Sequence, residues 1–223
     1  MPFVFCICFL KKSDSKDLKV FFVYTILLFI SIIAVITFRF IFKSYNSYLL
    51  YNRFYLVAEY ILISQFFVLN ITSIKLRKVM GYSIIPFTLF SIYDYVSSIG
   101  HPFTFYPLVF ECLLFPAIII LFFYEKMKHS NKYPIYLSPA FWIGVAFLIF
   151  STGNFFLFLF SKLLLQNDNN INLYNNIYGF FTILKNILLC IGIIVAKNYK
   201  IQDERSDINT NLELDSFIPF NKK

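Results

Sequence analysis

The chain has 223 residues, of which 59% are hydrophobic, 22% aromatic and only 14% charged, with a formal net charge of +8. A soluble domain carries about 25% charged residues, so this chain has too few polar side chains to cover a water-soluble globule. Its basic residues lie in short segments between apolar runs, which is typical of membrane topology and excludes nucleic acid as the expected partner.

Residues 1–19 are predicted to form a cytoplasmic N-terminal segment. The stretch MPFVFCICFL is apolar, but it lacks the basic start of a signal peptide and leads into KKSDSKDLK rather than a cleavage site. A short segment on the inner membrane surface and a misplaced start codon both fit this pattern. Cys6 and Cys8 are interpreted as small apolar side chains, because a zinc site needs four ligands.

Six apolar segments predict an all-α, polytopic transmembrane helix bundle over 20–196. Each is long enough to cross a hydrocarbon core of ~30 Å at about 1.5 Å per residue. The polar stretch 197–223 is predicted to be a short, disordered cytoplasmic tail. The six expected spans cover residues 20–41, 50–72, 79–99, 103–124, 139–161 and 174–196.

Lysine and arginine are distributed unequally between the two ends of these spans. With the N-terminus inside, 15 basic residues lie on the inner side and 4 on the outer side, and Lys185 lies within the sixth span. The positive-inside rule therefore predicts that both termini are cytoplasmic.

Polar residues inside the spans gather in the half that borders the outer surface. A charge at the bilayer centre costs about 2.5–3.5 kcal/mol on insertion scales, so these side chains should turn away from lipid and meet inside the bundle. The predicted polar cluster consists of Glu59, Asp94, Glu111, Asn154 and Lys185, with Arg53 nearer the rim.

Within this cluster we expect Glu59 to pair with Lys185 and Arg53 to neutralise a second carboxylate. The third carboxylate would then be solvated from outside or protonated, because burial disfavours its charged form. Three roles stay open for the Glu59–Lys185 pair: fixing helix register, binding a ligand or ion, and catalysis. Asn154 is expected to hydrogen-bond to a neighbouring helix.

No recognised catalytic or metal-binding motif occurs in the chain. His101 and His129 fall on opposite sides of the membrane in this topology, which excludes a three-histidine zinc site, and HExxH, GxSxG and Walker sequences are absent. We therefore predict no cofactor, no metal and no assigned catalytic residue. Asp94 and Glu111 could share a proton as a carboxylate pair, so the enzyme question stays open.

Five segments carry a resemblance to known proteins: VAEYILISQFF, SIYDYVSS, FYPLVFECLLF, PIYLSPAFWIGVAFLIFSTGNFFLFLFSK and TILKNILLCIG. They resemble small multi-pass inner-membrane proteins of Bacteroidota, especially flavobacteria, over about residues 18 to 198. The resemblance implies a bacterial inner membrane and transfers no catalytic residue. Some such proteins are similar to the membrane portions of bacterial two-component sensors, which favours a signalling function.

We interpret the chain as a non-enzymatic sensory or signalling accessory module with an outward-facing polar pocket. Its expected partners are the lipid bilayer and a cytoplasmic or membrane signalling partner. One alternative is a small ion- or proton-coupled transporter, which the apolar inner halves of the spans disfavour. The other is a carboxylate-based membrane lipid enzyme, for which a nucleophile–base pair is missing.

Overall fold

Helices are the only regular secondary structure in the described part of the chain, in agreement with the predicted fold class. The structure is a computed structural model that describes residues 2–10, 15–38, 45–97, 106–128, 134–161, 164 and 168–216. His101, His129 and the residues from 217 onward lie outside these ranges. The helices are α1 (Pro2–Leu10), α2 (Lys16–Ile36), α3 (Tyr45–Asn70), α4 (Ile74–Ser97), α5 (Tyr106–Lys128), the 3₁₀ turn η2 (Ile135–Leu137), α6 (Pro139–Leu159) and α8 (Asp168–Ser216).

Four described helices are long and apolar enough to cross a membrane, which indicates an integral, multi-pass membrane protein. They are α2, α5, α6 and the Asn170–Asn198 part of α8, at the positions of the first, fourth, fifth and sixth predicted spans. Helices α3 and α4 occupy the second and third predicted spans but are less apolar, because they carry charged residues along their length. That α3 and α4 also cross the membrane stays a prediction.

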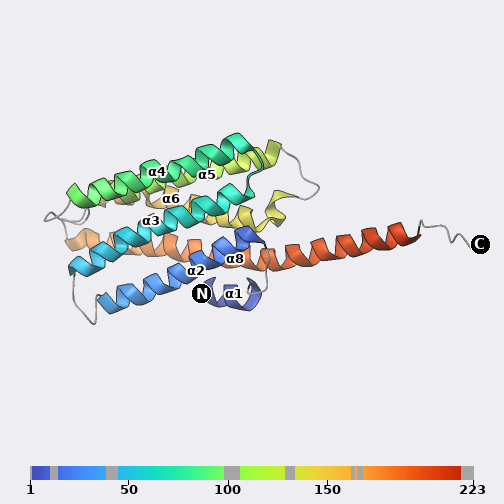
Figure 1. Cartoon of the computed structure of the whole chain (residues 1–223). Helices are drawn as coiled ribbons and strands as arrows, with labels where there is room; N and C mark the ends of the chain where they lie inside the picture. The colour runs from blue at the N-terminus through green and yellow to red at the C-terminus, as the bar shows by residue number, and fades with distance from the viewer. Residues whose placement is uncertain are drawn as a thin grey trace, which may run out of the picture.

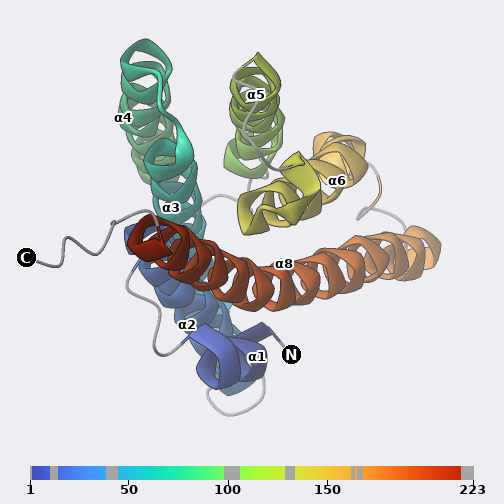
Figure 2. The same cartoon turned by 90° about the vertical axis from the view of Figure 1, so that its right-hand side faces the viewer.

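The long helices lie side by side and run back and forth along one direction (Figure 1). Helix α3 packs against α2, α4 and α5, while α8 packs against α6. The short helix α1 lies against α2 and α8 (Figure 2). The start of α2 and the far end of α8 are at the same end of the bundle. This arrangement places α3 and α8 so that their side chains can meet inside the bundle.

Helix α8 continues well beyond the membrane-length segment that ends at Asn198 and projects from the bundle as far as Ser216 (Figure 1). The sequence predicts a disordered tail from residue 197, whereas the described backbone there is helical. No glycine or proline occurs between Gly192 and Pro219, so this stretch lacks the two residues that most readily end a helix.

Aromatic side chains fill the interior of the bundle between the polar cluster and the end from which α8 projects. Tyr60 is fully buried, and its ring centroid lies 4.0 Å from that of Phe87 and 5.3 Å from that of Phe115. One to two turns further along α3, Phe67 meets Phe122 at 5.2 Å. These contacts join α3, α4 and α5 through close-packed rings of the kind that stabilise protein cores.

A buried carboxylate fixes the turn between α3 and α4. Oε1 of Glu125, at the end of α5, accepts hydrogen bonds from the backbone N–H groups of Thr72 and Ser73 at 3.0 and 2.5 Å. It also accepts one from the Thr72 hydroxyl at 2.7 Å. The first N–H groups of a helix have no partners within the helix, and a negative charge near this end is favourable. Glu125 therefore anchors the start of α4 to the end of α5.

Helices α6 and α8 approach each other closely at two glycines. A Cβ atom at Gly153 would overlap the ring of Phe181, and one at Gly192 would lie 3.2 Å from Ile143. Small residues at helix interfaces allow close backbone approach in membrane bundles. The position of α8 on α6, and hence of the side chains that α8 presents, depends on this fit.

We expect Gly153→Ala to lower the melting temperature of the detergent-solubilised protein, because the added methyl group must displace Phe181. Such overpacking costs about 1–3 kcal/mol. Gly179→Ala on α8 is the matched control, since a Cβ there meets nothing within 4 Å. The control should be neutral or slightly stabilising, because alanine favours helix over glycine. Equal melting temperatures for the two variants would contradict the close contact at Gly153.

Candidate functional site

All six residues of the predicted polar cluster are buried between helices. Their side chains come from α3, α4, α5, α6 and α8, so each of these helices turns a polar residue away from the outer surface of the bundle. Four of them form two ion pairs, Arg53–Asp94 and Glu59–Lys185. The other two are the carboxyl group of Glu111 and the amide of Asn154. The buried residues are Arg53, Glu59, Asp94, Glu111, Asn154 and Lys185.

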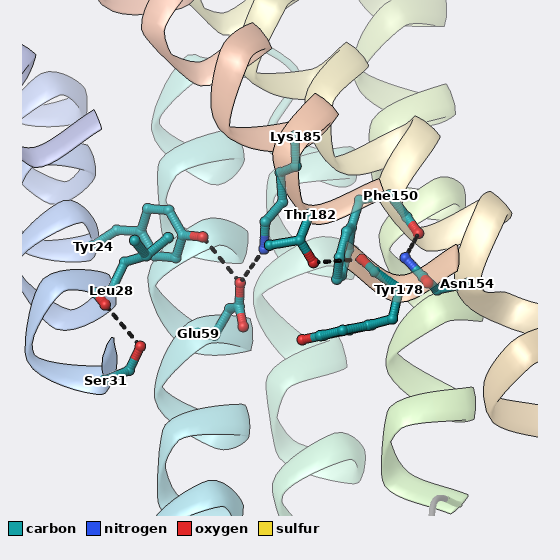
Figure 3. Close-up of polar contacts among 9 residues, drawn as sticks. All are labelled: Tyr24, Leu28, Ser31, Glu59, Phe150, Asn154, Tyr178, Thr182 and Lys185. Carbon is teal, nitrogen blue, oxygen red and sulfur yellow. Dashed lines mark hydrogen bonds and ion pairs between the residues drawn. The ribbon is translucent and has the colours of Figure 1, made fainter. Parts of the chain in front are cut away.

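Glu59 and Lys185 form an ion pair across the centre of the bundle, as the sequence predicts. The Lys185 ammonium donates to Oε1 of Glu59 at 3.3 Å. The Tyr24 hydroxyl donates to the same oxygen at 3.0 Å (Figure 3). One carboxylate oxygen therefore joins the consecutive helices α2 and α3 to α8, whose Lys185 lies 126 residues further along the chain than Glu59. Charge-assisted hydrogen bonds of this kind are stronger than bonds between neutral groups.

Two aromatic rings of α6 complete the surroundings of the Lys185 ammonium. Its nitrogen lies 4.0 Å from the ring centroid of Phe150 and 5.2 Å from that of Phe147. A cation over an aromatic face is attracted to it by about 2 kcal/mol or more when both are desolvated. The charge on Lys185 is thus balanced by Glu59 on one side and by two phenylalanines on the other.

Arg53 and Asp94 form the second ion pair, which joins α3 to α4 through Arg53 Nη1 and Asp94 Oδ2. Arg53 precedes Glu59 by six residues on the same helix, which is about 9 Å along its axis. The pair is therefore nearer to the start of α3 than the Glu59–Lys185 pair. Within the part of the chain that the structure describes, the cation that contacts Glu59 is Lys185.

Glu111 is the third buried carboxylate of the predicted cluster, and it takes part in neither of these two ion pairs. Its side chain, 6% exposed, interacts electrostatically with Glu59 and Lys185. Its Oε1 atom has no hydrogen-bond partner among the described residues. Among the described residues, the centre of the bundle therefore contains the carboxyl groups of Glu59 and Glu111 and the ammonium group of Lys185.

The sequence predicts that Asn154 hydrogen-bonds to a neighbouring helix, but the hydrogen bond that its side chain donates lies within α6. Its amide nitrogen donates to the backbone oxygen of Phe150, within its own helix, at 2.9 Å (Figure 3). Its Oδ1 atom, and the hydroxyl of Ser151 one turn earlier on α6, have no hydrogen-bond partner in the described part of the chain. A bond to the preceding turn is the nearest one an asparagine in a helix can make, and it orients the amide without tying α6 to a neighbouring helix.

Sequence reasoning missed two residues that shape this region. Tyr24 lies in an apolar segment of a chain with 16 tyrosines, and nothing local distinguishes it from a tyrosine that packs. Glu125 lies beside Lys126 at the end of a span and reads as a surface charge. The available signal was that Thr72 and Ser73, residues that favour helix starts, follow directly after α3.

The described residues contain no group of three or more histidine, cysteine, aspartate or glutamate side chains arranged to hold a metal ion. Cys6 is fully buried on α1. The chemistry of the central site is therefore that of carboxyl, hydroxyl, amide and ammonium groups.

No family model matches this chain, and neither a curated protein nor a solved structure matches it.

The ion pair predicts a specific pattern in a double-mutant cycle. Removing one partner of a buried pair costs about 3–5 kcal/mol, because an uncompensated charge stays behind. Glu59→Gln and Lys185→Met should therefore each lower the melting temperature strongly, whereas the double variant should recover most of the loss. Gln65→Ala, at an exposed position of α3, is the control and should have little effect. Losses that simply add would show that the two residues do not interact in the folded protein.

Proposed function

We propose that this protein is a non-enzymatic sensory or signalling accessory module of a bacterial inner membrane. In this proposal six spans cross the membrane, both termini are cytoplasmic, and the polar cluster lies nearer the outer surface. The observation that carries the proposal is that Lys185, the cation of the central pair, belongs to the helix that projects out of the bundle to Ser216.

A continuous helix can carry a change at the pair to the end of the extension. Lys185 and Ser216 lie 31 residues apart on α8, or about 46 Å at 1.5 Å per residue. The part of α8 after Gly192 contains no glycine or proline. A shift or rotation of α8 in the membrane would therefore move the extension with it. A partner that contacts the extension would then respond to the state of the central pair.

The packing of the bundle favours this function over a transporter. Between the polar cluster and the end from which α8 projects, α3 and α5 meet through fully buried rings such as Phe67 and Phe122. Alternating access requires a polar route that can open to both sides of the membrane. A close-packed aromatic layer in that position supports a closed, non-transporting bundle.

The ion pairs also argue against a carboxylate-based lipid enzyme. A hydrolase of this type would need Asp94 and Glu111 close enough to share a proton. Asp94 is instead paired with Arg53, while Glu111 interacts with Glu59 and Lys185. The two carboxyl groups therefore belong to different parts of the bundle.

The proposed topology predicts the behaviour of reporter fusions in a bacterial host. Green fluorescent protein fused after residue 223 should fluoresce, and alkaline phosphatase at the same position should be inactive, because both report a cytoplasmic C-terminus. The two reporters inserted after residue 168, in the proposed outer loop, should give the reverse pattern. Active phosphatase at the C-terminus would refute the orientation.

The proposed coupling predicts that the central pair controls the extension of α8. In lipid nanodiscs, the Glu59→Gln/Lys185→Met double variant removes both partners of the pair at once. We expect it to change amide hydrogen exchange over residues 199–216 several-fold, since local opening depends on the packing of each helix. Ile187→Ala, at a position of α8 that is 53% exposed, is the control. Unchanged exchange over 199–216 in a folded double variant would refute the coupling.

A further inference from the structure

Among the described residues, the central layer of the bundle carries more negative than positive groups. Glu59 is paired there with Lys185, whereas the Arg53–Asp94 pair lies nearer to the start of α3. Glu111 has no counter-charge of its own, and burying an isolated carboxylate away from water is very costly. One further positive charge at Glu111 would make this layer neutral.

The helix register brings other oxygen atoms to the level of Glu111. Helices α5 and α6 are antiparallel, and the rings of Phe115 and Phe147 meet between them at 5.2 Å. Glu111 lies one turn before Phe115, and Ser151 lies one turn after Phe147. Because residues four apart share a helix face, Glu111 and Ser151 face each other in the next layer of the α5–α6 interface.

The oxygens in this layer, and that of Asn154 about one turn further along α6, lack partners in the described part of the chain. Oε1 of Glu111, Oγ of Ser151 and Oδ1 of Asn154 are all buried without a hydrogen bond. Ser151 and Asn154 are fully inaccessible to solvent. Buried polar atoms of this kind are rare in folded proteins, and each calls for a partner such as a proton, an ion or water.

We propose that Glu111, Ser151 and Asn154 form a binding site for one monovalent cation, H⁺ or Na⁺. Carboxylate, hydroxyl and amide oxygens are hard ligands and suit hydrogen bonding as well as Na⁺. A divalent cation would overcompensate the single negative charge that Glu111 contributes. Ca²⁺ in particular takes 6–8 oxygen ligands, usually with several carboxylates.

The charged and titratable groups around Glu111 bear on how such a cation would act. Helix α6, which faces Glu111, contains no titratable residue. On α4, Asp94 is held by Arg53. The groups that interact electrostatically with Glu111 are Tyr24 of α2, Tyr55, Glu59 and Tyr60 of α3, Cys112 of α5 and Lys185 of α8.

This inference deepens the proposed function, because it names what the sensory module would bind. With the cation present, Lys185 is attracted to Glu59 alone. When the cation leaves, the ionised Glu111 competes with Glu59 for the Lys185 ammonium and draws α8 toward α5. Release of the cation would therefore cause α8, the helix that projects from the bundle, to move.

The test is thermal unfolding of the full-length protein in nanodiscs, with Na⁺ replaced by choline at constant ionic strength and with pH varied from 6 to 9. If the site holds Na⁺, its melting temperature should rise by about 5 °C at saturating Na⁺. If it holds a proton, Na⁺ should have no effect, and stability should fall as pH rises because the bound proton leaves. An infrared band of a protonated carboxyl group should then be present.

Glu111→Gln should abolish whichever response the wild-type protein shows, since the amide is uncharged and of similar shape. If this variant does not fold, the same Na⁺ and pH responses are measured on Ser151→Ala. It should weaken the Na⁺ response, or shift the protonated carboxyl band. Thr152→Val, at the exposed neighbouring position on α6, is the control and should behave like wild type.

The proposal is overturned if wild-type protein responds to neither Na⁺ nor pH, or if Glu111→Gln responds as wild type does. Its failure can be distinguished from failure of the proposed function. A cation response without altered hydrogen exchange over 199–216 would leave a cation site in a protein that does not signal through α8. If hydrogen exchange changes in the double variant but the protein shows no cation response, the coupling through α8 is supported and the cation site is refuted.

Discussion

A lysine ammonium buried in an apolar helix bundle constrains every helix around it. Transferring an ion from water to a protein interior costs several kcal/mol even after the surroundings relax. Lys185 meets this cost with the Glu59 carboxylate at 3.3 Å and two aromatic faces of α6. Helix α8 cannot slide by one turn along α3 or α6 without separating the charge from these groups. Lys185 therefore fixes the register of three helices together with the close glycine contacts between α6 and α8.

The rest of the structure follows as layers along the bundle. At the level of the pair the interior is polar, with Tyr24 bound to Glu59 and Glu111 nearby. Toward the end from which α8 projects, the interior becomes aromatic and then ends at Glu125, which holds the α3–α4 turn. A polar layer thus adjoins a tightly packed aromatic layer along the bundle, and α8 passes the level of both.

Several of these features could be predicted from the sequence, because they depend on local pattern. Apolar length indicated the helices, and Lys185 was the only deep cation that Glu59 could meet. The opposition of Glu111 and Ser151 could not be predicted, because the axial offset of α5 and α6 is set by ring contacts such as Phe115–Phe147. The helical backbone of 199–216 was missed for another reason, since polar composition suggested disorder while the absence of helix-breaking residues permits a helix.

The separation of Glu59 and Lys185 in the chain, 126 residues, has a consequence for biosynthesis. At about 5–20 residues per second, translation needs roughly 6 to 25 seconds after Glu59 has been made before Lys185 emerges. During this interval Glu59, and later also Glu111, exist without the lysine that Glu59 pairs with in the folded protein. The pair can form only once the last apolar helix has been made, because Lys185 belongs to α8.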